Sequence, residues 1–248
     1  MKRFALWLAL PLLAACQTGS DDNSLNTSQV GSTLNEAVSE AEQANDWVAA
    51  AEYYRTMFER APNDEKIALR YARVLRYAGF GPEALQVLAP FATKHADNVA
   101  LKIELGKDLI AASQAAKAVE LLKQAQAQAP RNWEIASALG IAYDYQDMSA
   151  EAQESYLKEL EITPENPVVL NNLALSQAKS GALPIAIATL ERAAKQPRAR
   201  MQIRQNLAML MALKGDSQGA ERLARQDLPA DMAGRNSSLY RLLAAPSN

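Results

Sequence analysis

Small and apolar residues recur along most of the chain with a period of 34 residues. Leucine or tyrosine, glycine and alanine each keep one phase of this period, with polar residues between them. Alanine occupies one phase in six successive periods, at Ala50, Ala84, Ala118, Ala152, Ala186 and Ala220. Such a fixed period is typical of stacked helical repeats, in which each unit buries its apolar face against its neighbours.

Each period contains the pattern of two helices joined by a turn. Gly79, Gly181 and Gly215 share a phase at which a helix is expected to end, because glycine tolerates a positive φ. Gly106 and Gly140 in the first helix, and the periodic alanines in the second, leave no bulk where two helices cross closely. The pattern predicts an all-α protein, a right-handed α-solenoid of about six repeats.

The period also sets the expected domain boundaries. Six units are expected, over residues 31–64, 65–98, 99–132, 133–166, 167–200 and 201–228. The first unit is degenerate in its leading helix. Residues 229–248 are expected to form a capping helix and tail, with Leu239, Leu242 and Leu243 covering the open side of the last unit.

The first residues have the features of a secretory signal peptide. Residues 1–15 contain two positive charges and then an apolar stretch of eleven residues, which ends just before Cys16, the single cysteine of the chain. Eleven helical residues rise about 16 Å, too little to span a bilayer. Residues 16–30 are polar and lack periodic apolar positions, so they are expected to form a flexible linker.

The sequence Leu13-Ala14-Ala15-Cys16 resembles the lipobox of bacterial lipoproteins. The resemblance implies cleavage between Ala15 and Cys16 and a covalent diacylglycerol and acyl chain on Cys16. Gln17 stands where this class carries aspartate for retention in the inner membrane, so the resemblance implies the periplasmic side of the outer membrane. Two or three acyl chains would hold the mature protein on a membrane.

Composition, charge and the absence of certain motifs argue against several classes of function. The chain has 48 alanines against 10 glycines, which favours helix, and its net charge of -2 does not favour nucleic-acid binding. One cysteine excludes an internal disulfide and a thiolate metal cluster, and His95 is the single histidine, expected in an exposed turn. Phosphate-loop and nucleophile-elbow motifs do not occur. We therefore expect no enzyme, no metal and no small-molecule substrate.

The stacked first helices of such a solenoid line a concave groove that can hold a peptide. By the phase of the repeat, the groove positions are Arg73, Arg76, Tyr77, Ile103, Lys107, Ile110, Ile141, Asp144, Tyr145, Asn171, Leu175, Gln205 and Met209. A groove that is basic at one end and apolar in the middle would suit an amphipathic or extended segment of a protein. The alternative is that these residues are merely exposed on a scaffold. Five aromatic residues, Trp47, Tyr71, Trp133, Tyr143 and Tyr156, are expected in the core instead.

The periodic residues resemble the tetratricopeptide repeat, a helix-turn-helix unit of this length. Among lipidated proteins of this kind, the mature chain resembles the TadD family of tight-adherence (Flp) pilus assembly. The more distinctive part is GDSQGAERLARQDLPADMAGRNSSLYRLL, with residues 227–229 closing the sixth unit and Asn236, Tyr240 and Arg241 in the final helix. The resemblance implies a pilotin or assembly factor that binds the outer-membrane secretin. An adaptor for another envelope machine, in outer-membrane protein assembly or cell-wall enzyme regulation, remains the alternative.

Overall fold

The computed structural model describes residues 21–197, 199, 201–226 and 230–244, and this part of the chain is helical without a strand. Ala15, Cys16 and the rest of the expected signal peptide lie outside the described residues. The helices are α1 (Asp21–Gln43), α2 (Trp47–Arg60), α3 (Glu65–Tyr77), α4 (Gly81–Lys94), α5 (Val99–Ala111), α6 (Ala115–Gln128), α7 (Trp133–Asp144), α8 (Ser149–Ile162), α9 (Pro167–Lys179), α10 (Leu183–Ala194), α11 (Met201–Leu213), α12 (Ser217–Ala224) and α13 (Ala230–Leu243).

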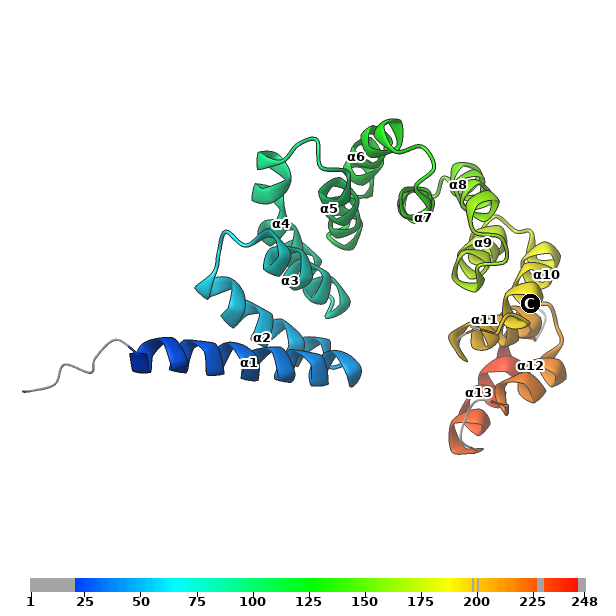
Figure 1. Ribbon diagram of the computed structural model, residues 1–248. Coiled ribbons are helices and arrows are strands. Elements are labelled where there is room, and N and C mark those ends of the chain that lie inside the picture. The colour runs from blue at the N-terminus through cyan, green and yellow to red at the C-terminus, as the bar shows by residue number, and fades with distance from the viewer. Residues whose placement is uncertain (1–20, 198, 200, 227–229, 245–248) are drawn as a thin grey trace, which may run out of the picture.

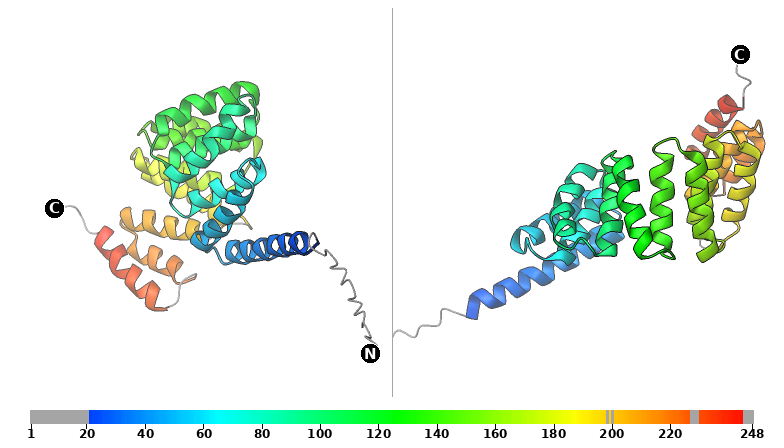
Figure 2. Two further views of the ribbon diagram at one scale, coloured as in Figure 1. Left: turned by 90° about the vertical axis from the view of Figure 1, so that its left-hand side faces the viewer. Right: turned by 90° about the horizontal axis from the view of Figure 1, so that it is seen from above.

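The helices form an arch of antiparallel pairs (Figure 1). Each helix packs on the next one along the chain, and α3, α5, α7, α9 and α11 also contact one another in series. These five, the inner helices, line the inside of the arch, and α4, α6, α8, α10 and α12 form its outer layer (Figures 1 and 2). The prediction of an all-α solenoid is confirmed. From α3 onward, each inner helix and the outer helix after it fall within one predicted unit.

An aspartate or asparagine starts four successive inner helices at the spacing of the repeat. Asp64, Asn98, Asn132 and Asn166 each accept hydrogen bonds from backbone N–H groups in the first turn of α3, α5, α7 and α9. These side chains satisfy donors that have no partner within the helix, which contributes about 1 kcal/mol each. The sequence analysis did not identify this periodic cap, although its residue types are the usual ones.

The turn inside each unit requires a left-handed residue. Gly79, Gly181 and Gly215 have φ of 87°, 86° and 101°. The same phase in the other three units is occupied by Asn45, Ser113 and Asp147, with φ of 56°, 60° and 59°. The turn geometry is therefore constant in all six units even where the glycine is missing.

The periodic small residues lie where the helices cross. All six alanines of the 34-residue series, from Ala50 to Ala220, have no exposed surface. A Cβ on Gly106 would approach Leu122 Cδ2 to 2.7 Å, and a Cβ on Gly140 would approach Tyr156 Cε1 to 2.4 Å. The apolar core that results runs from unit to unit along the whole arch. Close packing between the two layers therefore requires small residues at these phases.

The two ends of the solenoid differ from the sequence-based expectation. Helix α1 begins at Asp21, so the part of the expected linker from residue 21 to residue 30 is helical. No proline interrupts this stretch, and the helix that packs on α2 continues through it. None of the described helices is both long and apolar enough to cross a membrane.

The final helix, α13, packs on α11 and α12 as a cap. Tyr240 is its buried anchor, 3% exposed, and Leu243 is partly buried in the same cluster. Leu239 and Leu242 were expected to cover the last unit, but they are 47% and 72% exposed. That expectation was wrong because α13 turns the face with Tyr240 toward α11 and α12. Residues 227–229 lie outside the described residues.

Candidate functional site

The inner side of the arch carries a pocket of about 540 Å³ between α3, α5 and α7. The predicted groove residues that line it are Arg73, Arg76, Tyr77, Lys107, Ile110, Ile141 and Tyr145. Ala111, Trp133, Glu134, Ser137 and Ala138 complete the lining. Residues that the repeat phase predicted for the groove in three successive units therefore lie together in one pocket.

Aromatic rings surround the apolar part of this pocket. Tyr77, Trp133 and Tyr145 are 56%, 44% and 65% exposed, and the partly exposed Ile141 of α7 lines the pocket with them. The ring of Tyr77 also packs on that of Trp47, with centroids 4.8 Å apart. The expectation that Trp133 packs in the core was wrong: it is the first residue of α7, where less of the solenoid covers a side chain.

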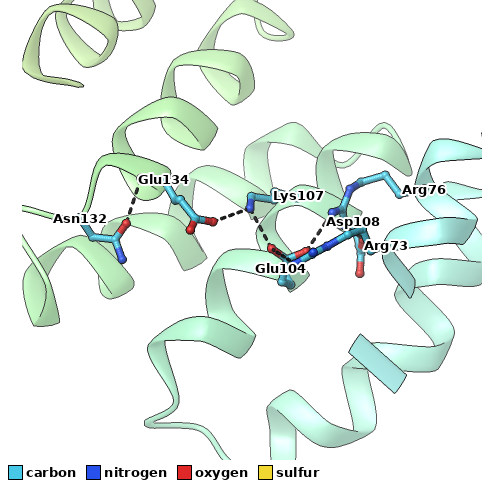
Figure 3. A network of polar contacts seen from close by, with 7 residues as sticks. All are labelled: Arg73, Arg76, Glu104, Lys107, Asp108, Asn132 and Glu134. Carbon is cyan, nitrogen blue, oxygen red and sulfur yellow. Dashed lines mark hydrogen bonds and ion pairs between the residues drawn. The ribbon is translucent and has the colours of Figure 1, made fainter. Parts of the chain in front are cut away.

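A network of charged side chains connects α3, α5 and α7 beside the pocket (Figure 3). The Arg76 guanidinium donates to both Asp108 and Glu104, the latter at 2.9 Å. Lys107 Nζ lies 2.8 Å from a carboxylate oxygen of Glu104 and 2.8 Å from one of Glu134. Each of these carboxylates therefore joins two helices, α3 with α5 or α5 with α7.

Burial and the neighbouring cations act in opposite directions on the pKa values of the two central acids, Asp108 and Glu104. Burial raises the pKa of Asp108 to about 6 although Arg76 lowers it, and Asp108 Oδ2 has no hydrogen-bond partner among the described residues. Burial also acts to raise the pKa of Glu104, but Lys107 and Arg76 together outweigh it, so the pKa is lowered. Burial lowers the pKa of Arg76, but Asp108 and Glu104 raise it by more. Glu104 and Arg76 are therefore a charged pair at neutral pH.

The expectation of a basic end of the groove holds for Arg73, whose side chain is 52% exposed, and is corrected for Arg76. Arg76 is mostly buried, and its charge, like that of Lys107, is compensated by carboxylates that the sequence analysis missed. The sequence contained a signal for Asp108, because its phase holds Val74, Ala142, Ser176 and Leu210 in other units, and all four are buried. An acid at a core phase needs a cation from a neighbouring helix, because an unpaired buried charge is costly.

The other predicted groove residues do not line this pocket. Ile103 is 4% exposed and belongs to the core, so its assignment to the groove was wrong. Its helix, α5, contacts both α3 and α7, and they cover an apolar side chain from two sides. Asp144 accepts hydrogen bonds from Tyr156 and Ser176, which attach α7 to α8 and α9.

The remaining predicted positions lie further along the arch, on α9 and α11. Asn171 accepts a hydrogen bond from Asn206 at 2.8 Å, which links these two helices. Leu175 and Gln205 are partly buried, and Met209 is 37% exposed. None of them is a lining residue of the pocket between α3, α5 and α7. The structure thus separates the predicted groove into the pocket and a continuation along α9 and α11 that is part polar and part apolar.

The chemistry available at the pocket is that of a binding surface. Arg76, Lys107 and Glu134 are paired with charged neighbours, whereas Arg73 is exposed. The exposed area of the pocket comes largely from rings and aliphatic side chains. His95 lies elsewhere, at the end of α4, with Nε2 3.7 Å from Glu65. Within the described residues, no group of three or more histidine, cysteine or acidic side chains is placed to hold a metal ion.

The sequence matches no described protein family and no curated protein. The fold of this chain resembles those of several solved structures. A thermophilic TPR protein of Thermus thermophilus superposes with a TM-score of 0.64 at 17% identity, over 73% of this chain and 98% of that chain. MamA of Desulfovibrio magneticus superposes with a TM-score of 0.52 at 16% identity, over 69% of this chain and 97% of that chain. The fold is therefore that of a tetratricopeptide-repeat solenoid.

Proposed function

We propose that this protein is a lipid-anchored scaffold that binds a segment of a protein partner in the pocket between α3, α5 and α7. One observation carries the proposal: Tyr77, Trp133 and Tyr145 are exposed around an apolar hollow on the inner side of the arch. Clustered exposed aromatic rings mark interaction sites, because their burial by a partner is favourable and tyrosine and tryptophan are frequent binding hot spots.

The partner that we propose is the secretin of a tight-adherence pilus, which makes this protein a pilotin or assembly factor. The resemblance of residues 215–243 to the TadD family supports this partner, and the lipobox at residues 13–16 supports attachment at the outer membrane. In this arrangement the acyl chains place the scaffold at the membrane, and the pocket holds a secretin segment during delivery.

Capture of the partner tests the pocket. The full chain, purified in neutral detergent, is used to capture the secretin from envelope extracts. Ile141→Glu should reduce capture at least tenfold, because it places a charge in the apolar part of the pocket. Leu157→Glu is the matched control: Leu157 is 53% exposed on α8 in the outer layer, and its replacement should leave capture unchanged. Equal capture by all three proteins would contradict the proposal.

Labelling tests the membrane anchor separately. Radiolabelled palmitate should be incorporated into the wild-type protein and should be absent from Cys16→Ser, which should also leave the outer-membrane fraction. Retention of the Cys16→Ser protein in that fraction would contradict lipid anchoring. Capture of an outer-membrane assembly factor or a cell-wall enzyme in place of the secretin, still sensitive to Ile141→Glu, would favour the other envelope machines.

A further inference from the structure

Helix α3 presents a row of cationic side chains to the inside of the arch. Lys66, Arg70 and Arg73 follow one another at spacings of four and three residues, which places them on one face over about 10 Å. All three are exposed, and the side chain of Arg73 is 52% exposed. Tyr77, the next residue on this face, lines the pocket between α3, α5 and α7, which we call the aromatic pocket. We refer to Lys66, Arg70 and Arg73 as the α3 row.

The α3 row begins at a second hollow of about 460 Å³, between α1, α2 and α3. Lys66 and Arg70 line it together with Glu42 and Tyr54. By the repeat, Lys66 and Arg70 correspond to Glu134 and Ala138 of the aromatic pocket, two units later. On α3 the second hollow therefore uses the phase that the aromatic pocket uses on α7, with cations where the aromatic pocket has an acid and an alanine.

The charges of the α3 row are incompletely compensated within the protein. Lys66 Nζ has no partner among the described residues. Arg70 lies beside Tyr54, whose hydroxyl donates a hydrogen bond to Glu42 at 3.2 Å. The nearest carboxylate to Arg73 is Glu104, at 3.6 Å, and Glu104 is already shared by two closer cations. An anionic partner would therefore find exposed cations along the full row.

We infer that the segment held in the groove is acidic where it crosses the α3 row and carries a large apolar residue that enters the aromatic pocket. This inference rests on the proposed function, because it specifies the occupant of the same site. The distance along α3 from Lys66 to Tyr77 is about 16 Å, which about five residues of extended chain cover. Charge complementarity sets the register of the segment, and the apolar anchor supplies most of the affinity.

The position of the α3 row favours a peptide over an anionic membrane. Helix α3 lies on the inner side of the arch, which continues past it through α5, α7 and α9 (Figure 1). The residues of the α3 row line the two hollows beside this helix. A flat bilayer contacts convex or planar surfaces and does not enter such a concavity, whereas an extended chain does. An anionic lipid headgroup is therefore the competing ligand for the test and not the proposed one.

Fluorescence anisotropy with designed peptides tests the inference on the full chain in neutral detergent. The probe is a fluorescein-labelled peptide, GSDEDEGFLGSG, compared with its uncharged form GSNQNQGFLGSG. The acidic peptide should bind at least about tenfold more tightly, and raising the salt from about 50 mM to about 200 mM should remove most of this preference. Lys66→Glu with Arg70→Glu should abolish the preference. Lys117→Glu, at an exposed lysine of α6 in the outer layer, should not.

Three outcomes would overturn the inference. The first is equal binding of the two peptides with continued sensitivity to Ile141→Glu, which leaves the proposed function intact. The second is an acidic preference that survives the double replacement in the α3 row. The third is binding of phosphatidylglycerol vesicles through Lys66 and Arg70 without binding of the acidic peptide, which would assign the row to lipid. Circular dichroism of each variant ensures that the comparison is made between folded proteins.

Discussion

Gly140 of α7 lies directly against the ring of Tyr156 of α8, so close that a Cβ would come within 2.4 Å of the ring. One unit earlier, Gly106 has the same relationship with Leu122. Both outer residues are completely or almost completely buried. The distance between the inner and outer layers is therefore set in each of these units by a glycine opposite a large side chain.

Gly140→Ala should destabilise the protein by about 2 kcal/mol. Overpacking in a rigid core costs about 1 to 3 kcal/mol, and the better helix propensity of alanine recovers less than about 1 kcal/mol of it. Gly106→Ala should cost less, because leucine can change its rotamer and a buried ring cannot. Urea unfolding, monitored by circular dichroism, gives the free energy of unfolding of both variants. A larger loss for Gly106→Ala than for Gly140→Ala would contradict this account of the packing.

Ser113→Gly should stabilise the protein by about 1 kcal/mol. Ser113 has φ of 60° at the phase where three other units have glycine, and a side chain in this region is disfavoured by about 1 to 2 kcal/mol. The reverse change, Gly79→Ala, should destabilise by a similar amount, although the new methyl group meets no atom within 4 Å. Thermal melts of both variants measure the difference, and the same sign for both would refute the conformational explanation.

The ion pair between Arg76 and Asp108 can be tested by a double-mutant cycle, and the next repeat shows which apolar pair could replace it. The equivalent positions one unit later are Ile110 and Ala142, a buried apolar pair. Asp108→Ala alone should cost about 3 kcal/mol, because it leaves the buried guanidinium with one carboxylate fewer. Arg76→Ile with Asp108→Ala should recover most of this loss. Denaturant unfolding of the four proteins gives the coupling energy, and additive effects would exclude the pairing.

Glu159 of α8 is a second acid at a core phase. It has no exposed surface, neither carboxylate oxygen has a hydrogen-bond partner among the described residues, and the equivalent residues of two other units are Ala125 and Ala193. Burial raises its pKa to about 7. Tyr156 is its ionisable neighbour on α8. Burial is the main cause that raises the pKa of Tyr156, and the charges of Asp144 and Glu159 add to it.

The stability of the protein should therefore decrease as the pH rises from about 4.5 to about 7. In this range the folded protein keeps the proton on Glu159 and the unfolded chain loses it, so each pH unit removes stability, up to about 3 kcal/mol in total. Glu159→Gln should be more stable than wild type at pH 8 and should lack this part of the pH dependence. Unfolding curves at several pH values test this, and parallel pH profiles for the two proteins would contradict it.

The candidate site was predicted in part. The repeat phase identified Arg73, Tyr77 and Ile141 as residues of one surface, because stacking of equal units places equal phases side by side. It failed at Ile103 and Trp133, since exposure depends on which neighbouring helix covers a position and on how near the position lies to a helix end. Phase alone does not contain that information.

The sequence by itself determined the helical repeat, the turn positions and the phases that must be small, because these follow from residue types at a fixed spacing. The tertiary structure alone decided which charges compensate one another. Arg76 contacts Asp108, 32 residues later, across two stacked helices, while Lys66 Nζ on the same helix has no partner in the part of the chain that the structure describes. Electrostatic pairing acts through space over a few ångströms, so it depends on how the units stack and not on the order of residues within one unit.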